Sequence, residues 1–225
     1  MNPVLRGSAA HVFVEALAAP QLSDDDDHHL RRVLRIRDSD VITASDGAGR
    51  WVAARLDAGG LRVESEPVVE PPPRAAAVFS AVPKGDRAEW MVQKLTEVGA
   101  TTIGFIDCTR SVVRWDEERG RRQVERLRRI AREAAMQSRR VWLPEVLEIV
   151  PIAVASCNMC CAIAEPDGAD DLVGVDAMLV GPEGGFTPDE LSLVARRVSL
   201  SRQVLRVETA ALVAVVMLTL RNESH

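Results

Sequence analysis

A short apolar run that ends in a glycine-rich turn constrains the fold of this chain more than any other stretch. Residues 177–180 have the character of a buried strand, and residues 181–186 then read Gly-Pro-Glu-Gly-Gly-Phe. Thr187 is a suitable helix N-cap, Pro188 suits the first helical position, and Glu190 completes a capping box. The stretch therefore predicts a strand that delivers a glycine-rich loop to the edge of a sheet, where open α/β folds bind ligands.

The predicted loop does not have the features of a phosphate loop. It lacks a Lys-Ser/Thr ending, and its glycines do not follow the G-x-G-x-x-G spacing. It also carries Glu183, whose negative charge opposes a phosphate. A neutral or cationic ligand fits this loop better.

The composition is that of an ordinary globular chain. Of the 225 residues, 47% are apolar, and the longest apolar run, residues 210–218, is about half the length of a membrane span. The N-terminus lacks the pattern of a secretory signal. We expect a soluble, cytoplasmic protein with no membrane partner.

Three of the four cysteines form a C-x-x-C-C cluster at Cys157, Cys160 and Cys161. No second cysteine pair and no nearby histidine completes a zinc set, so no metal is expected. The surrounding apolar residues 152–164 predict a strand, and the cysteines are interpreted as reduced core thiols.

Positive charge is concentrated in the middle of the chain, although the net charge is −5. Between Arg110 and Arg140 there are 11 arginines and 5 acidic residues. The arginine fork suits phosphate and base recognition, whereas a solvated helix face joined by salt bridges explains the same residues without RNA. The pattern alone leaves both readings open.

A run of three prolines, residues 71–73, predicts a domain boundary, because it forms an extended spacer. Residues 1–70 contain short strands with glycine turns, which favours a small β-barrel. After the prolines, strands and helices alternate, which predicts a parallel sheet covered by helices. The expected strands are residues 75–82, 102–106, 154–164 and 177–180, and the expected helices are residues 86–99, 119–138, 188–198 and 208–220.

A second loop, residues 201–210, joins a short apolar segment to the last helix. Glu208 and Thr209 fall in the first turn of that helix, where an acid and a hydroxyl can meet unpaired backbone amides. Simple helix capping explains these two residues when they are considered alone.

Both loops resemble the knot-forming motifs of the SPOUT methyltransferases. More narrowly, they resemble those of the RsmE family, the 16S ribosomal RNA uridine-N3 methyltransferases. The matching segments are Gly181-Pro182-Glu183-Gly184-Gly185-Phe186 and Leu205-Arg206-Val207-Glu208-Thr209-Ala210-Ala211, with Val82-Pro83-Lys84-Gly85-Asp86-Arg87, Gln93 to Gly99, Thr109-Arg110-Ser111, Arg129 to Ala135, Gln137-Ser138 and His28 to Arg35 upstream. The likeness covers most of the chain.

The resemblance implies an α/β chain with two domains. Residues 74–225 would form a SPOUT-type methyltransferase domain with a C-terminal deep trefoil knot, an exception to the rule that chains do not thread through loops. Residues 1–70 would form an RNA-binding, PUA-like β-barrel. The implied cofactor is S-adenosyl-L-methionine, the implied substrate is the 16S ribosomal RNA of the small subunit, and the implied assembly is a homodimer.

The resemblance also assigns site residues. Arg206 would stabilise the uridine anion, and Glu183 or Glu208 would be the base, although a structural role fits each acid equally well. The cofactor-binding residues would be Leu179, Val180, Gly181, Pro182, Glu183, Gly184, Gly185, Leu200, Ser201, Val204, Leu205, Arg206, Thr209 and Ala210. The RNA-binding residues would be Arg32, Arg35, Lys84, Arg87, Arg110, Arg139 and Arg140.

The sequence departs from the family pattern at three positions. Ser201 stands where glycine is usual, Val207 where threonine is common, and Met136 where an acid precedes Gln137-Ser138. Two other functions remain open: a SPOUT enzyme that acts on another RNA or on a ribose 2′-hydroxyl, and a non-catalytic RNA-binding assembly factor.

Overall fold

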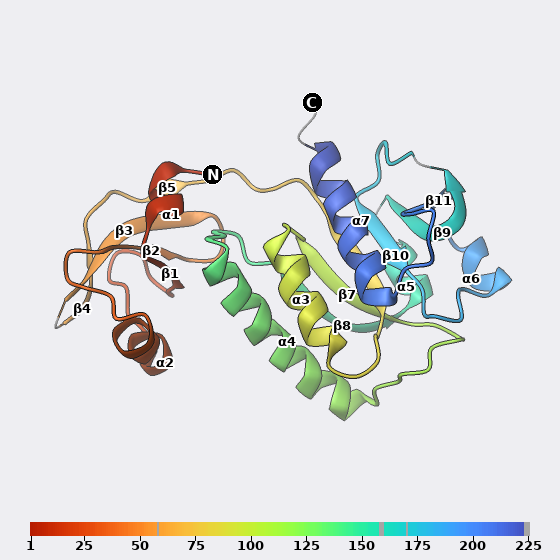
Figure 1. The fold of residues 1–225 in the computed structure, drawn as a ribbon, viewed down its shortest axis with the longest axis horizontal. Coiled ribbons are helices and arrows are strands. Elements are labelled where there is room, and N and C mark those ends of the chain that lie inside the picture. The colour runs from red at the N-terminus through yellow and green to blue at the C-terminus, as the bar shows by residue number, and fades with distance from the viewer. Residues whose placement is uncertain (58, 158–159, 170, 223–225) are drawn as a thin grey trace. The chain divides into compact units, whose positions relative to one another are not determined.

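The computed structural model describes residues 1–57, 59–157, 160–169 and 171–222 (Figure 1). The chain divides into two compact units. We call them the N-terminal unit, Met1–Pro73 with Arg132–Leu143, and the C-terminal unit, Arg74–Ala131 with Pro144–His225. Each unit is described separately.

The N-terminal unit is built on one sheet. Its strands run in the order β1–β2–β3–β4, with β5 paired to the start of β3; β1 and β2 are parallel, and the other pairs are antiparallel. The core beside this sheet includes Val12, Leu30 and Ile42. The elements are α1 (Pro3–Gly7), β1 (Ala10–Phe13), α2 (Asp24–His28), the π-helical turn η1 (His29–Val33), β2 (Val41–Ser45), β3 (Arg50–Asp57), β4 (Gly60–Val63) and β5 (Val68–Val69).

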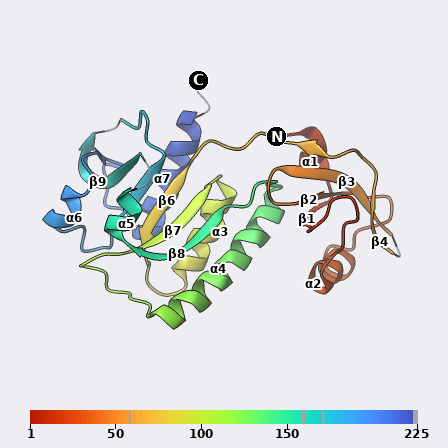
Figure 2. The same cartoon turned by 180° about the vertical axis from the view of Figure 1, so that it is seen from behind.

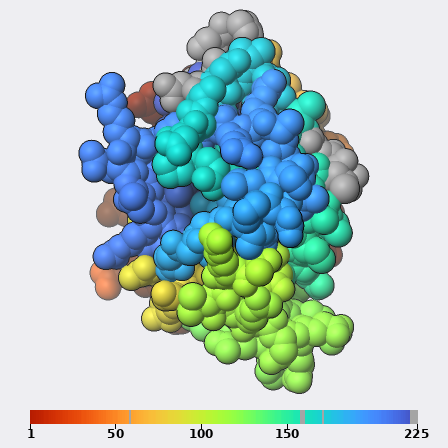
Figure 3. Space-filling model, turned by 90° about the vertical axis from the view of Figure 1, so that its right-hand side faces the viewer, coloured from red at the N-terminus to blue at the C-terminus, as the bar shows by residue number. Residues whose placement is uncertain are grey.

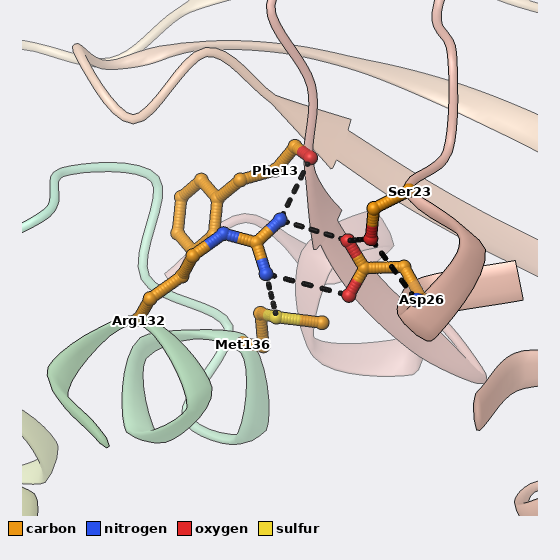
Figure 4. Close-up of polar contacts among 5 residues, drawn as sticks. All are labelled: Phe13, Ser23, Asp26, Arg132 and Met136. Atoms are coloured by element: carbon orange, nitrogen blue, oxygen red, sulfur yellow. Dashed lines mark hydrogen bonds and ion pairs between the residues drawn. The ribbon is translucent and has the colours of Figure 1, made fainter. Parts of the chain in front are cut away.

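Residues 132–143 belong to this unit because their side chains and backbone bond to it. Arg132 pairs with the buried carboxylate of Asp26 and also donates to the carbonyl of Phe13 and contacts the sulfur of Met136 (Figure 4). Arg139 donates to the carbonyls of Ser8 and Ala9. The sequence placed all of residues 74–225 in one domain, whereas the structure groups residues 132–143 with the N-terminal segment.

The C-terminal unit holds a six-stranded parallel sheet in the order β11–β9–β10–β6–β7–β8. Its elements are β6 (Ala77–Ala81), α3 (Arg87–Glu97), β7 (Thr102–Asp107), α4 (Glu117–Gln137, whose last residues count with the N-terminal unit), β8 (Glu145–Pro151), α5 (Ile152–Cys157), β9 (Cys161–Ala169), β10 (Ala177–Val180), α6 (Pro188–Ser192), β11 (Arg197–Val198) and α7 (Val207–Asn222).

Helices cover both faces of this sheet, which confirms the predicted α/β architecture. On one face, α3, α4 and α7 pack on alternate strand residues such as Val78, Ile103 and Met178. On the other, α5 and the α6 region pack on the residues next to them in the strands, such as Phe79 and Leu179. Because successive strand residues point to opposite faces, both of which are covered, β10 is apolar throughout and β6 is apolar except for the buried Ser80. Figure 2 shows the strands and α5 from behind.

Three local predictions were wrong. In the predicted strand at residues 154–164, residues 154–157 belong to helix α5, residues 158–159 lie outside the described residues, and strand β9 starts only at Cys161. Strand β8 was not predicted. The predicted helix at residues 188–198 is the short helix α6, which ends at Ser192, followed by strand β11 at Arg197–Val198. An apolar run has the same composition in a buried helix and a buried strand, so tertiary packing decided these segments. The predicted capping box of Thr187 and Glu190 is confirmed.

Candidate functional site

A cavity of about 420 Å³ lies at the carboxyl end of β10 and beside the middle of β9. Figure 3 shows the side of the molecule on which the β9 segment, in cyan, and the chain before α7, in blue, reach the surface. The cavity is lined by Ala164, Glu165, Pro166, Val180, Gly181, Pro182, Glu183, Gly185, Phe186, Leu200, Ser201, Gln203, Val204, Leu205, Arg206, Val207 and Ala210. The two loops that the sequence singled out therefore meet at one site.

The glycine-rich loop, residues 181–186, has a compact conformation that side chains would disturb. Gly185 has φ +68° and donates its N–H to the carbonyl of Pro182 at 2.8 Å, which closes a tight turn. A Cβ on Gly181 would lie 2.8 Å from the ring of Phe186. Glycine is required at both positions, at Gly185 by the left-handed backbone and at Gly181 by close packing.

Glu190 fastens this loop to the segment that follows β7. Its carboxylate accepts hydrogen bonds from the backbone N–H groups of Thr109 and Thr187, each at 2.7 Å. Burial alone raises the pKa of Glu190, but the hydrogen bonds from Thr109 and Thr187 outweigh it and hold that pKa below its ordinary value. Arg110 makes a second link to the loop, because its Nη1 donates hydrogen bonds to the carbonyls of Gly184 and Phe186 at 3.0 and 3.2 Å.

The opposite wall is the segment before α7. Val204 is an apolar side chain that lines the cavity yet is 97% exposed, so it has almost no protein contacts there. Leu205 is half-buried beside it, and Val207 begins α7. Within the segment, the Ser201 hydroxyl accepts a hydrogen bond from the N–H of Gln203 at 3.0 Å. The wall thus presents apolar side chains to whatever occupies the cavity.

Most of the predicted cofactor-binding residues line this cavity, but three do not. Leu179 packs in the core on the other face of the sheet, Gly184 lies against Arg110, and Thr209 is half-buried in α7. The sequence missed Ala164, Glu165, Pro166, Phe186, Gln203 and Val207 as lining residues. Ala164, Glu165 and Pro166 lie in the middle of β9, a strand that the sequence misplaced at residues 154–164, and the pairing of β9 with β10 is a tertiary property.

The three candidate catalytic residues have different surroundings. Arg206 lines the cavity, and within the described part of the chain its guanidinium makes no hydrogen bond or ion pair. Glu183 also lines the cavity, and Lys84 Nζ lies 3.6 Å from its Oε1. Glu208 is buried outside the cavity lining, with its Oε1 3.5 Å from Arg87 Nη1. The structure thus brings Arg206 and Glu183 together at the cavity and pairs Glu208 of α7 with Arg87 of α3.

The predicted RNA-binding residues differ in whether their side chains contact other groups of the protein. Arg32 and Arg35 are exposed in the N-terminal unit. Lys84 and Arg87 pair with Glu183 and Glu208, as described above. Arg110 and Arg139 donate to backbone carbonyls, and burial lowers the pKa of Arg139 and lowers that of Arg140 to about 10. Arg110, Arg139 and Arg140 therefore interact with other parts of the protein, whether or not they also contact RNA.

Several arginines of helix α4 form ion pairs with nearby acidic side chains. Arg121 and Arg122 pair with the acids one turn earlier, Arg128 pairs with Glu125, and Arg126 pairs with Glu89 of α3. This is the solvated, salt-bridged face that the sequence left open as an alternative. The number of arginines therefore overstates the positive charge that this helix offers to a partner.

The cysteines do not form a common core. Cys160 is exposed and Cys161 is half-buried, so the prediction of core thiols is wrong for Cys160, and the side chain of Cys157 lies outside the described residues. Burial, with the charges of Glu190 and Asp107, raises the pKa of the Cys108 thiol to about 12. The described residues contain no group of three or more side chains suited to hold a metal, and no described helix could cross a membrane.

Comparison with known sequences places this site in a family. A family model described as the RNA methyltransferase domain matches residues 70–219, and one described as the RNA methyltransferase PUA domain matches residues 22–66. The ribosomal RNA small subunit methyltransferase E of Mycobacterium bovis is 32% identical to this chain, over 88% of this chain and 84% of the relative. This chain belongs to the RsmE family of RNA methyltransferases. The resemblance inferred from the sequence motifs is thereby confirmed.

Other members of the family agree over the full length. The ribosomal RNA small subunit methyltransferase E of Bacillus subtilis is 26% identical, over 93% of each chain. The crystal structure of the Neisseria gonorrhoeae protein of the same name, bound to S-adenosyl methionine, superposes with a TM-score of 0.73 at 27% identity and covers 92% of this chain and 95% of that one. The fold and the family are thus common to all three proteins.

Proposed function

We propose that this chain is an S-adenosyl-L-methionine-dependent methyltransferase that methylates N3 of a uridine in the 16S RNA of the small ribosomal subunit. The observation that carries the proposal is the cavity formed by the glycine-rich loop and residues 200–207, in a chain of this family. The solved Neisseria gonorrhoeae relative binds S-adenosyl methionine, which supports the choice of cofactor.

The residues of the cavity fit that cofactor. Leu200, Val204 and Leu205 offer apolar surface for an adenine ring, and the loop around Gly185 exposes backbone groups to the ribose and methionine parts. The acids Glu165 and Glu183 suit a ligand that carries a sulfonium cation. Bound there, S-adenosylmethionine supplies an electrophilic methyl group, and its sulfonium becomes a neutral thioether when the methyl leaves.

The protein must help uracil N3 to lose its proton, because N3 is protonated at neutral pH and becomes nucleophilic only without that proton. The N3 electron pair then forms the new bond to carbon. Arg206, at the cavity and without a partner among the described residues, is placed to stabilise the negative charge that develops on the uracil. The proton passes to a base or to water.

Glu183 is the better placed of the two candidate bases. It lines the cavity and is partly exposed, whereas Glu208 is buried against Arg87. A base must come within hydrogen-bond reach of the proton that it removes, directly or through one water molecule. We therefore assign Glu208 to the packing of α7 against α3, and we retain Glu183 as the candidate base.

The proposal includes the finer features that the family resemblance implies. These are a C-terminal deep trefoil knot, a PUA-like β-barrel over residues 1–70, a homodimer, and RNA contacts by Arg32, Arg35, Lys84, Arg87, Arg110, Arg139 and Arg140. We also propose a cytoplasmic location. Light scattering tests the dimer. The Cα path of an experimental structure tests the knot, because a chain that straightens when both ends are pulled is unknotted.

Two measurements test the function. Calorimetry should detect binding of S-adenosylmethionine to the protein or to its RNA complex, and no binding in either case would favour the non-catalytic assembly factor. Mass mapping of small subunits from a deletion strain should show the loss of one methyl group at a uridine N3. If a ribose methyl disappears instead and the N3 methyl persists, the enzyme acts on a ribose hydroxyl.

A further inference from the structure

Glu165 is an acidic side chain that lines the cavity, and it takes no part in the proton transfer proposed above. It lies in the middle of β9, the parallel neighbour of β10, and Ile163 of β9 pairs in register with Leu179 of β10. Continuing that register by two residues brings Glu165 level with Gly181, the first residue of the glycine-rich loop. Both residues line the cavity.

The carboxylate of Glu165 is available to a ligand. It is half-buried and makes no hydrogen bond or ion pair with any residue in the described ranges. Burial raises its pKa above the ordinary value, the charge of Arg197 lowers it, and the charge of Asp167 raises it. A half-buried carboxylate in this state gains from a cationic partner.

The other acids at or near the cavity are already engaged. Glu183 has Lys84 at 3.6 Å, and Glu208 has Arg87 at 3.5 Å. Glu190 accepts two backbone N–H groups. Of these four acids, Glu165 is thus the one whose carboxylate makes no hydrogen bond or ion pair within the described residues and can accept a hydrogen bond from a bound molecule.

Glu165 also contributes to the local charge. The ionisable side chains that line the cavity are Glu165, Glu183 and Arg206, and Lys84 stands beside Glu183. The charges of Arg197 and Asp167 also act on Glu165, and they are opposite in sign. Loss of the negative charge of Glu165 makes the potential in the cavity more positive, which disfavours a cation there.

We propose that Glu165 makes this cavity prefer the cationic methyl donor to its neutral thioether product. The inference rests on the proposed function, because donor and product differ in charge only at the sulfur. S-adenosylmethionine carries a positive sulfonium there, and S-adenosylhomocysteine carries an uncharged thioether. A carboxylate that favours the sulfonium strengthens binding of the donor and loses that attraction once the methyl group has been transferred, which favours product release.

Three compounds separate charge recognition from shape recognition. S-adenosylmethionine and sinefungin are cationic at this position, since sinefungin carries an ammonium group in place of the methylsulfonium, whereas S-adenosylhomocysteine is neutral. Titration calorimetry would compare all three on the full-length wild-type protein and on Glu165→Gln, Glu165→Asp and Asp167→Asn. Asp167 is the matched control, because it is an exposed acid on the same strand that does not line the cavity.

Glu165→Gln should weaken S-adenosylmethionine and sinefungin by roughly tenfold, and S-adenosylhomocysteine by less than about threefold. Glu165→Asp should restore part of the preference, and Asp167→Asn should leave all three affinities within about twofold of the wild type. The thermal midpoint of ligand-free Glu165→Gln should match that of the wild type, because the side chain has no partner to lose within the described residues.

Equal weakening of all three compounds by Glu165→Gln would overturn the inference, because it would place Glu165 at the ribose or adenine that they share. Unchanged affinities would overturn it as well. Both results differ from a failure of the proposed function, in which the wild-type protein itself binds none of the three compounds and the inference fails with it.

Discussion

Arg132 Nη2 lies 2.8 Å from Asp26 Oδ2, and the two side chains form a two-point ion pair within the N-terminal unit (Figure 4). The two partners differ in exposure, since the Asp26 side chain is 8% exposed and that of Arg132 is 36% exposed. The guanidinium also lies over the ring of Phe13, at 5.7 Å from its centroid. Loss of one partner should therefore have a different effect from loss of the other.

Arg132→Leu should destabilise the N-terminal unit more than Asp26→Asn does. The first change leaves a buried carboxylate without its cation and should cost about 3 kcal/mol, whereas the second leaves a guanidinium that water can reach and should cost about 1 kcal/mol. Urea denaturation combined with hydrogen exchange of β1 and β2 measures both. Glu118→Gln, which removes the exposed pair with Arg122, is the control and should change stability by less than about 0.5 kcal/mol. The reverse order of the two effects would contradict this account.

Glu190→Gln should loosen the glycine-rich loop. The amide nitrogen of glutamine cannot accept a hydrogen bond, so either Thr109 or Thr187 loses its partner, at a cost of about 1–3 kcal/mol. Thermal unfolding and calorimetry with S-adenosylmethionine should both show the loss. Asp189→Asn removes a neighbouring exposed acid of the same helix and should have the smaller effect on both. Equal effects of the two variants would assign the result to helix charge alone.

The same carboxylate gives stability a pH dependence of known sign. The folded-state pKa of Glu190 is lowered, so the folded protein binds fewer protons there than the unfolded chain. The contribution of Glu190 is complete above its ordinary pKa and is lost as the pH falls through the lower, folded-state value. Glu190→Gln should therefore flatten the acid limb of the stability curve, and an unchanged limb would contradict the assignment.

His11 should add an independent pH dependence in the N-terminal unit. It is 2% exposed, its Nδ1 lies 2.8 Å from the Thr43 hydroxyl, and burial lowers its pKa from 6.5 to about 4. Between these values the unfolded chain binds the proton and the folded chain does not, so stability rises with pH and is complete above 6.5. The expected difference across the window is about 3 kcal/mol, because one pKa unit is worth about 1.4 kcal/mol. His11→Gln should abolish this slope in chemical denaturation at several pH values, and persistence of the slope would assign it to another group.

Arg206→Ala should lower turnover far more than it lowers the affinity for S-adenosylmethionine. If the guanidinium stabilises the uracil anion, its loss should reduce kcat by roughly a hundredfold to a thousandfold, with cofactor affinity changed by less than about threefold. Single-turnover methylation of small-subunit RNA and calorimetry measure the two quantities. Equal losses would place Arg206 in cofactor binding instead.

Glu183→Gln should impair methyl transfer without affecting the fold. The ion pair with Lys84 is long and exposed, with side-chain exposures of 51% for Lys84 and 40% for Glu183, so its loss should change stability by less than about 0.5 kcal/mol. A structural role in the turn predicts the opposite result, with lower stability and normal methylation. Thermal unfolding and a methylation assay on the same preparation separate the two.

The sequence by itself determined the parts of the site that depend on local chemistry. The glycine-rich turn after β10 and the capping box of Thr187 and Glu190 follow from residue types over a few positions, because glycine and capping side chains act on their own backbone. The alternation of apolar strands and amphipathic helices likewise determined the parallel α/β architecture of the C-terminal unit.

Only the tertiary structure decided which distant groups meet. It placed Glu165 in the cavity through the pairing of β9 with β10, and it paired Glu208 with Arg87. It also grouped residues 132–143 with the N-terminal segment. It also chose helix for α5, where an apolar run fits a buried helix or a buried strand. The physical reason is that local patterns set backbone conformation and periodicity, whereas partners far apart in sequence are selected by strand order, register and packing.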